Sequence, residues 1–241
     1  MKDDSCKFHC YWNIRKNDLV RTDIIDKIKL VIFDMDGVLT DIDSSWKHIH
    51  DYFGSSNQKS VDDYLKGKID YLEFIRRDIA LWKENGKLVK KKKIEDILSD
   101  VPIMKGAYEC ISALKLKNIK TIIVSAGLDI LSNRVAKELG IDYDYSNGIK
   151  TDVNGYLTGD GTMQVRLIYK DKIVKEISEK MNIPLESIAG VGNSCFDIPM
   201  LKACGLGIAF NPSDECIKEA ADIVVVEKDL SKIIPFIERY M

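Results

Sequence analysis

Short apolar runs separated by helical patterns constrain the fold of this chain more than any other feature. The runs are each about as long as a strand and cover 29–33, 120–124, 187–191, 205–209 and 222–226. Apolar runs without polar alternation are typical of strands buried on both faces. Between them, amphipathic patterns predict helices over 106–117, 129–139 and 171–181, the second capped by Gly140. The alternation predicts an α/β fold, with a central parallel sheet covered by helices on both faces.

Two regions interrupt this alternation. Residues 44–102 contain helical patterns and no good strand, which predicts a small all-helical cap inserted after the first strand and rejoining the core near Pro102. Residues 143–158 contain the turn dipeptides Asn147-Gly148 and Asn154-Gly155, which predict a β-excursion. The predicted division is an N-terminal extension of unknown role at 1–27, a core at 28–42 and 103–241, and a helical cap at 43–102.

Charge and hydropathy exclude several classes of partner. The formal net charge is −2, so a basic surface for nucleic acid is not expected, and the lysine-rich stretch Lys87–Lys93 is interpreted as a solvated helix face. No segment has the 18 or so consecutive apolar residues of a membrane span, and no apolar region near the start resembles a secretory signal. A cytoplasmic protein is therefore expected; the sequence predicts no particular oligomeric state.

The six cysteines are scattered, as is typical of reduced thiols in a chain of this length. Cys6, His9 and Cys10 are close enough in sequence to bind one zinc ion together. A closed structural zinc site needs a fourth ligand, and none lies nearby. We therefore favour an extension of unknown purpose over a metal site.

Polar residues follow the apolar runs where a parallel sheet would bring them together. The acids Asp34 and Asp36 follow the first run, and Ser125-Ala126-Gly127 follows the second. Lys170 lies on the helix before the third run, and Asn193 and Asp197 come after that run. Each has an ordinary structural interpretation as a cap, a turn or a surface charge. Because ligands of open α/β sheets bind outside the carboxyl ends of the strands, the joint arrangement predicts a single site.

The residue types in this site suit phosphoryl transfer through an aspartyl-phosphate. Asp34 would attack phosphorus, while Asp36 would protonate the leaving oxygen and then deprotonate the hydrolytic water. A carboxylate nucleophile repels a phosphate dianion, so a bridging cation is needed, and Mg²⁺ is the hard ion that suits oxygen ligands. The hydroxyl of Ser125 with the Ala126 and Gly127 amides would hold phosphate oxygens, and the charge of Lys170 would stabilise the transition state.

In its motifs the chain resembles the haloacid dehalogenase superfamily of phosphatases. The segments DMDGVLT, VSAG and GNSCFD, together with Lys170, are similar to the four motifs of that family in order and spacing. The likeness runs from about residue 28 to 237, includes the IDYDYSNG, GYLTGD, DIPML and EKDLSKI segments, and is strongest to phosphoserine phosphatase-like members with a small helical cap. It implies a Rossmann-like three-layer core, Mg²⁺ dependence and hydrolysis of a phosphomonoester.

The resemblance also implies roles for single residues. Asp34 matches the nucleophile and Asp36 the general acid and base, whose backbone carbonyl also contacts the metal. Lys170 matches the motif lysine better than Lys172 does, because its spacing to Gly192 needs no gap. The ligand set implied for Mg²⁺ is Asp34, Asp36, Asn193 and Asp197.

The last motif departs from the family pattern at Asn193, where an aspartate is usual. An amide oxygen is neutral, so we predict an active enzyme with weakened metal affinity. The alternative is that Asn193 marks a silenced enzyme or an engineered substitution.

Specificity residues also depart from the pattern of phosphoserine phosphatases. Asp43 takes the place of a longer acidic residue, and Asp78 aligns with a cap arginine that binds the substrate carboxylate. An acid there would repel that carboxylate, so phosphoserine is a doubtful substrate unless a one-residue shift brings Arg77 into place. Trp46 also belongs to the predicted cap mouth, although core packing is the favoured interpretation for Trp46 and Trp82, and a solvated helix face for His48 and His50.

The sequence therefore predicts a Mg²⁺-dependent phosphatase acting on a small phosphorylated metabolite. Two alternatives stay open. A phosphomutase would use the same aspartyl-phosphate but return the phosphoryl group to substrate, and a catalytically impaired binding protein would keep only the fold.

Overall fold

The computed structural model describes residues 27–241, so the calls on 1–26, including Cys6, His9 and Cys10, lie outside the described residues. A seven-stranded sheet forms the centre, in the order β6-β5-β4-β1-β7-β8-β9. Neighbouring strands are parallel except for the β5–β6 pair, which is antiparallel. The strands of the sheet are β1 Leu30–Phe33, β4 Lys120–Leu128, β5 Tyr143–Thr151, β6 Leu157–Thr162, β7 Ile188–Gly192, β8 Leu206–Phe210 and β9 Ile223–Val225.

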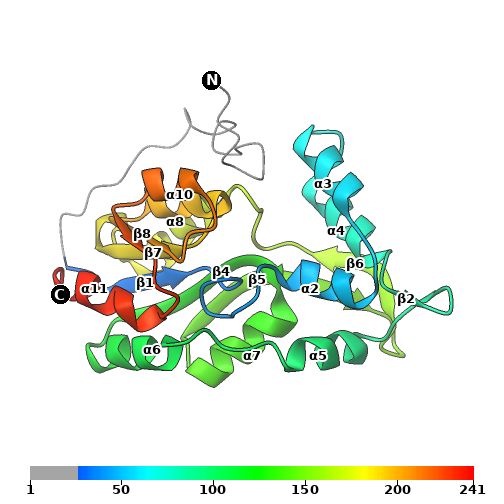
Figure 1. Cartoon of the computed structure of the whole chain (residues 1–241), viewed down its shortest axis with the longest axis horizontal. Helices are drawn as coiled ribbons and strands as arrows, with labels where there is room; N and C mark the ends of the chain where they lie inside the picture. The colour runs from blue at the N-terminus through cyan, green and yellow to red at the C-terminus, as the bar shows by residue number, and fades with distance from the viewer. Residues whose placement is uncertain (1–26) are drawn as a thin grey trace.

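Helices cover both faces of this sheet (Figure 1). The core helices are α6 Ala107–Leu116, α7 Asp129–Leu139, α8 Lys170–Met181, α9 Ile198–Ala203, α10 Glu215–Ala220 and α11 Ile234–Glu238. Figure 1 shows α6 and α7 on one side of the strands and α8 and α10 on the other. The predicted α/β fold with a parallel sheet is confirmed.

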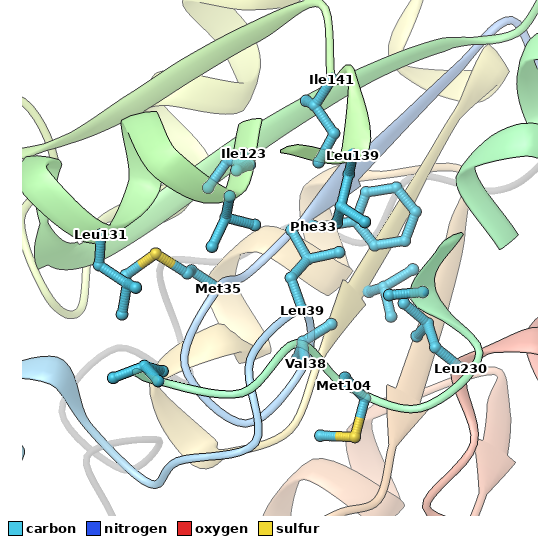
Figure 2. Packing of buried hydrophobic residues seen from close by; sticks show 14 of the residues in the cluster. Phe33, Met35, Val38, Leu39, Met104, Ile123, Leu131, Leu139, Ile141 and Leu230 are labelled. Carbon is cyan, nitrogen blue, oxygen red and sulfur yellow. The ribbon is translucent and has the colours of Figure 1, made fainter. Parts of the chain in front are cut away.

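Alternate residues of the central strand β1 pack into two separate apolar layers. Val31 and Phe33 belong to the cluster under α6 and α7, and Leu30 and Ile32 belong to the cluster under α8 and α9. All of these side chains are fully buried. Figure 2 shows Phe33 within the first cluster, together with Ile123 of β4. This two-sided burial is the physical reason why the strand sequences contain no polar alternation.

The segment between β1 and α6 contains four helices: α2 Ser45–Tyr52, α3 Gln58–Leu65, α4 Tyr71–Ile79 and α5 Lys91–Ser99. It also contains a hairpin of β2 (Lys83–Glu84) and β3 (Lys87–Leu88), so the prediction of a purely helical insert missed one feature. Asn85 and Gly86 both have positive φ, at 50° and 76°, as a two-residue hairpin turn requires. The lysine-rich stretch was therefore wrongly interpreted as one helix face, since it begins in a strand. The predicted cap boundaries stay a prediction.

The excursion at 143–158 is present, but one of its predicted turns is not a turn. Asn154 and Gly155 lie between β5 and β6, where the Asp152 carboxylate accepts hydrogen bonds from the backbone N–H groups of Asn154 and Tyr156. Asn147-Gly148, in contrast, lies inside β5, and Gly148 pairs with Thr162. The Asn147 side chain is fully buried and hydrogen-bonded, which accounts for its place in a strand.

Within residues 27–241, no helix has the length and apolar character needed to cross a membrane.

Candidate active site

The sheet order brings the predicted site residues to one edge. Strand β1 lies between β4 and β7, and the three strands are parallel, so their carboxyl ends lie side by side. Asp34 directly follows β1, and its backbone N–H donates to the Val191 carbonyl of β7. Ser125 and its two neighbours form the irregular end of β4, where the pairing register with β5 shifts. The structure thus groups the segments that the sequence analysis predicted would meet.

Lys170 is the buried cation that pairs with two of the acids at this edge of the sheet. It is the first residue of α8 and only 2% exposed. Its ammonium lies 2.8 Å from Asp34 Oδ1 and 2.6 Å from Asp197 Oδ1. Burial alone lowers the pKa of Lys170, but the charges of Asp197 and Asp34 raise it by more, so the group stays protonated. Lys172, the other candidate, is exposed and lies against the Tyr169 ring instead.

Asp197 is held by hydrogen bonds on both carboxylate oxygens. Oδ1 accepts from Lys170, and Oδ2 accepts from the backbone N–H groups of Asn193 (2.9 Å) and Ser194 (3.1 Å). Gly192 makes this approach possible, because a Cβ there would lie 2.3 to 2.8 Å from Asp197 side-chain atoms. Both carboxylate oxygens of Asp197, one of the four predicted metal ligands, are therefore occupied by protein donors. These contacts position Lys170 and the turn after β7.

The two acids after β1 are both shifted toward the protonated form. Burial and the neighbouring charge of Asp197 raise the pKa of Asp34 to about 7, although Lys170 opposes the shift. Burial also raises the pKa of Asp36, and hydrogen bonds from Ser45 oppose that shift. For Asp36, a raised pKa suits a carboxyl group that must both give and take a proton.

Ser45 is a site residue that the sequence analysis missed. Its backbone N–H and its hydroxyl each lie 2.8 Å from Asp36 Oδ2 and donate to it. The same hydroxyl oxygen accepts from the backbone N–H of Leu128 at the end of β4. Gly127 leaves room for this arrangement, since a Cβ there would lie 2.8 Å from both Asp36 Oδ2 and Ser45 Oγ. Nothing in the sequence distinguishes Ser45 from its neighbour Ser44, which is the ordinary N-cap of α2.

The predicted phosphate-binding residues 125–127 are held by a hydrogen bond among themselves and by the side chain of Asn147. Ser125 Oγ accepts a hydrogen bond from the backbone N–H of Gly127 at 3.1 Å, which leaves the hydroxyl hydrogen available to another acceptor. The buried Asn147 amide donates to the Ala126 and Val165 carbonyls, and its oxygen accepts from the backbone N–H groups of Gln164 and Val165. Asn147 therefore joins the end of β4 to the segment that leads into α8.

The donor set is consistent with a hard divalent ion. Asp36 Oδ1 is buried and accepts no hydrogen bond from protein, whereas Asp34 Oδ1 is paired with the Lys170 ammonium, so an oxygen of Asp36 is available at this edge. Asn193, half-buried, packs its side chain against Gly37 on the Asp36 turn. Within the described part of the chain, no group of three or more His, Cys, Asp or Glu side chains is placed to hold a metal. Oxygen ligands of this kind suit Mg²⁺.

The predicted cap-mouth residues do not share one location. Trp46 donates from Nε1 to the Ala126 carbonyl at 3.0 Å, so it contacts the phosphate loop directly. Asp43 is exposed just before α2. The Arg77 guanidinium binds Glu73 and Asp63 at 3.0 Å each, and the alternative in which Arg77 takes the place of Asp78 stays a prediction. Asp78 itself is 2% exposed and lies on α4.

The interpretation of His50 as a solvated residue is wrong. His50 is 2% exposed, and its Nδ1 lies 3.2 Å from the indole N–H of the fully buried Trp82. Its Nε2 lies 3.4 Å from Asp78 Oδ2. His50 lies with Ser45 and Ile49 on the buried side of α2, which the short amphipathic pattern did not reveal.

Comparisons with known proteins identify the class. Residues 28–205 match the family model described as haloacid dehalogenase-like hydrolase. The chain is 30% identical to the phosphoserine phosphatase of Methanocaldococcus jannaschii, an alignment that covers 88% of this chain and 99% of that protein. It is 32% identical to the phosphoserine phosphatase of Archaeoglobus fulgidus, covering 84% of this chain and 58% of that protein.

Solved structures of phosphoserine phosphatases also match this chain. A substrate-bound phosphoserine phosphatase complex matches with a TM-score of 0.74 and 29% identity, and the alignment covers 88% of this chain and 99% of that one. A phospho-aspartyl intermediate analogue of phosphoserine phosphatase matches equally well, with a TM-score of 0.74, 30% identity and the same shares of the two chains. The chain belongs to the haloacid dehalogenase-like hydrolase family. The predicted class of enzyme, a phosphoric monoester hydrolase, is thereby confirmed.

Proposed function

We propose that this chain hydrolyses a small phosphomonoester by transferring the phosphoryl group to Asp34 and then to water. The proposal is supported above all by the placement of Asp34, whose Oδ1 lies 2.8 Å from Lys170 at the edge where Ser125 and Asp36 also meet. It is supported further by the similarity to a structure of a phospho-aspartyl intermediate analogue.

In the first step an Asp34 oxygen attacks phosphorus, and the bond between phosphorus and the ester oxygen breaks. Asp36, whose pKa is raised by burial, gives its proton to the leaving oxygen in this proposal. In the second step Asp36 takes a proton from water, which attacks phosphorus and releases inorganic phosphate. Asp34 is then free again, so atoms and protons balance over one turnover.

The other residues bind the group in transfer. The Ser125 hydroxyl, with backbone N–H groups at the end of β4, would hold phosphate oxygens. Trp46 and Asn147 keep this end of the strand in place through the Ala126 carbonyl. The Lys170 ammonium would offset the charge that develops on the equatorial oxygens. Asp197 acts through Lys170 and is a positioning residue in this proposal.

The cofactor in this proposal is Mg²⁺, held by Asp34, Asp36 and Asn193. When bound, the ion would screen the repulsion between the Asp34 carboxylate and the substrate dianion. Because an amide oxygen carries no formal charge, the affinity for the ion should be lower than with three carboxylates. Asp197 was also predicted as a ligand, but its oxygens are taken by protein donors.

Phosphoserine is expected to be a poor substrate, although the relatives are phosphoserine phosphatases. A carboxylate brought near Asp78 would meet a buried like charge. The proposed substrate class is therefore a phosphomonoester without a carboxylate.

The test is turnover of p-nitrophenyl phosphate with and without Mg²⁺. The wild-type chain should release phosphate only with the ion, and Asp34→Asn should lose activity by at least about a thousandfold, as expected when a nucleophile is removed. Asp41→Asn is the matched control, because Asp41 is an exposed acid seven positions away that pairs with Lys228. Turnover that survives in Asp34→Asn would refute the proposal. Absence of turnover in every protein would favour the binding-protein alternative, and an isomerised sugar phosphate without free phosphate would favour a mutase.

A further inference from the structure

The loop after β8 holds the turn that carries Asn193. That turn, residues 193–197, follows β7, and β7 and β8 are parallel neighbours, so the two segments leave the sheet side by side. The loop after β8 contacts the turn at Asn193 and Cys195, on either side of Ser194. Asn193 belongs to the proposed Mg²⁺ ligand set, so a contact that fixes this turn also fixes a proposed ligand.

Ser213 donates two hydrogen bonds to the backbone carbonyl of Asn193. The donors are its backbone N–H at 2.8 Å and its hydroxyl at 3.0 Å. The backbone N–H of Asn193 donates to Asp197 Oδ2, so both backbone polar groups of Asn193 have partners. The Asn193 side chain therefore leaves a main chain that is fixed on both sides, and it packs its amide against Gly37.

Asp214, which is 5% exposed, holds the next part of the turn. Its Oδ2 accepts from the backbone N–H of Cys195 at 2.7 Å, and its Oδ1 accepts from the backbone N–H of Ile217 at 3.0 Å. The bond to Ile217 is an ordinary N-cap of α10. The bond to Cys195 is not a helix cap, because Cys195 lies 19 positions earlier in the chain. One carboxylate therefore joins the start of α10 to the turn after β7.

Three consecutive backbone N–H groups of the turn donate to two carboxylates. Asp197 accepts from Asn193 and Ser194, and Asp214 accepts from Cys195. Asp197 belongs to the turn itself, whereas Asp214 belongs to the neighbouring loop. The position of the turn relative to the sheet edge therefore depends on a carboxylate outside the predicted site.

The exact position of the turn matters because the proposed ligand there is an amide. A neutral amide attracts a cation through the dipole of its C=O bond, so its contribution depends on direction as well as on distance. Mg²⁺ also demands near-ideal octahedral geometry. Groups that hold metal ligands in place commonly contribute about 10- to 100-fold to metal affinity. Asn193, the neutral member of the proposed ligand set, should benefit most from a fixed main chain.

We propose that Asp214, assisted by Ser213, is a positioning residue for Mg²⁺ binding, because it holds the turn after β7 where the Asn193 amide oxygen can reach the ion. This rests on the proposed function and adds two residues to the same site. Asp214 and Ser213 act through the main chain of the turn and not on the substrate. Both lie outside the segments that resemble the family motifs.

The experiment separates the two bonds of Asp214. Serine is about as good an N-cap as aspartate, but its side chain is shorter and has one oxygen in place of two. Asp214→Ser should therefore keep the cap on α10 and lose the bond to Cys195. In a calorimetric titration its dissociation constant for Mg²⁺ should be at least about tenfold higher than that of the wild-type chain. An unchanged dissociation constant would overturn the proposal.

Asp70→Ser is the matched control for the helix cap. Asp70 is the exposed N-cap of α4, where it accepts from the backbone N–H of Glu73 at 2.8 Å. The variant makes the same chemical change at a cap that does not touch the turn after β7, so it should bind Mg²⁺ as the wild-type chain does. An equal loss of Mg²⁺ affinity in both variants would contradict a specific role for Asp214.

Ser213→Ala tests the same turn without touching a buried group. It removes the hydroxyl bond to the Asn193 carbonyl at an exposed position and keeps the backbone bond. The dissociation constant for Mg²⁺ should rise by about threefold, the size of one lost hydrogen bond, while the urea midpoint stays near wild type. Ser99→Ala, which removes an exposed hydroxyl bond to the Asp96 carbonyl, is the control. If Asp214→Ser failed to fold, a wild-type dissociation constant in Ser213→Ala would overturn the proposal.

Calorimetry needs no turnover, so this proposal and the proposed function can fail separately. Weakened Mg²⁺ binding by Asp214→Ser, in a chain that hydrolyses nothing, would support the positioning role and refute the phosphatase. In an active enzyme, the half-saturating Mg²⁺ concentration of Asp214→Ser should rise at least about tenfold, while kcat at saturating Mg²⁺ stays within about twofold of wild type. An active wild-type chain that binds no Mg²⁺ would overturn the positioning role together with the cofactor assignment.

Discussion

Ser45 donates two hydrogen bonds to one oxygen of Asp36, one from its backbone N–H and one from its hydroxyl, each at 2.8 Å. Ser45 is the first residue of α2, and Asp36 follows β1, so the contact joins the start of the inserted segment to the catalytic edge of the sheet. The hydroxyl also accepts from Leu128, which ties the end of β4 to the same point. The orientation of the proposed acid and base therefore depends on a residue outside the four motifs.

Replacing that hydroxyl should impair proton transfer. We expect Ser45→Ala to lower kcat by about tenfold or more with a smaller change in KM, because Asp36 loses one of its two orienting bonds while the substrate contacts remain. Ser44→Ala is the control at the adjacent position, since the Ser44 side chain only caps α2 through Lys47. It should cost about 1 kcal/mol of stability and leave kcat unchanged. A Ser45→Ala enzyme with wild-type kcat would show that the contact is only structural.

Lys170 should be needed for folding as well as for activity. In Lys170→Met the carboxylates of Asp34 and Asp197 would face each other without the cation that now lies 2.8 and 2.6 Å from them. Breaking a buried charge network in this way typically costs about 3–5 kcal/mol. Urea unfolding of Lys170→Met should show that loss, whereas Lys172→Met, at an exposed position of the same helix, should stay near wild type. Equal midpoints for the two variants would contradict the role given to the buried ion pairs.

Asn193 should set the strength of metal binding. Replacement by Asp adds a charged oxygen to the proposed ligand set, so Asn193→Asp should bind Mg²⁺ about tenfold more tightly in a calorimetric titration. Asn118→Asp makes the same chemical change at an exposed turn and should leave the titration as in wild type. If both variants gave the wild-type affinity, Asn193 would not be a ligand. If Asn193→Asp alone restored turnover to an inactive chain, the silenced-enzyme alternative would be favoured.

Asn147 should matter for both stability and phosphate binding. Its amide satisfies two carbonyls and two backbone N–H groups, all of which would lose a partner in Asn147→Ala. Leaving buried polar groups unsatisfied costs about 1–3 kcal/mol each, so a loss of several kcal/mol is expected in chemical unfolding, together with a raised KM. Asn154→Ala, in the exposed turn after β5, should change neither quantity much. A fully stable Asn147→Ala protein would contradict this account.

Much of the fold follows from the sequence because the strands are buried on both faces. The helix predicted at 129–139 is α7 at the same bounds, with Gly140 in the left-handed conformation at φ 70°. The predicted runs at 29–33 and 187–191, which precede Asp34 and Asn193, correspond to β1 and β7. These two strands are neighbours in the sheet. Parallel-strand order alone was enough to bring those residues to one edge.

Other contacts could not be predicted, because they depend on distances between segments far apart in sequence. Ser45 and Asn147 act through side-chain bonds to residues that only the packed sheet brings near, and Asn147 carried a turn signal that tertiary hydrogen bonds overrode. The burial of His50 and Asp78 likewise depends on how α2 and α4 meet around Trp82. The Asn85-Gly86 hairpin, in contrast, had a readable signal that the helical patterns around it obscured.

The most direct test of the whole account is to identify the residue that carries phosphorus during turnover. The wild-type chain is mixed with substrate and Mg²⁺, quenched within one turnover, reduced with borohydride and examined by peptide mass spectrometry. Borohydride converts an aspartyl-phosphate to homoserine, and the account predicts homoserine at Asp34 and at no other acid. Steady release of phosphate with unmodified Asp34, or with homoserine at another position, would contradict it.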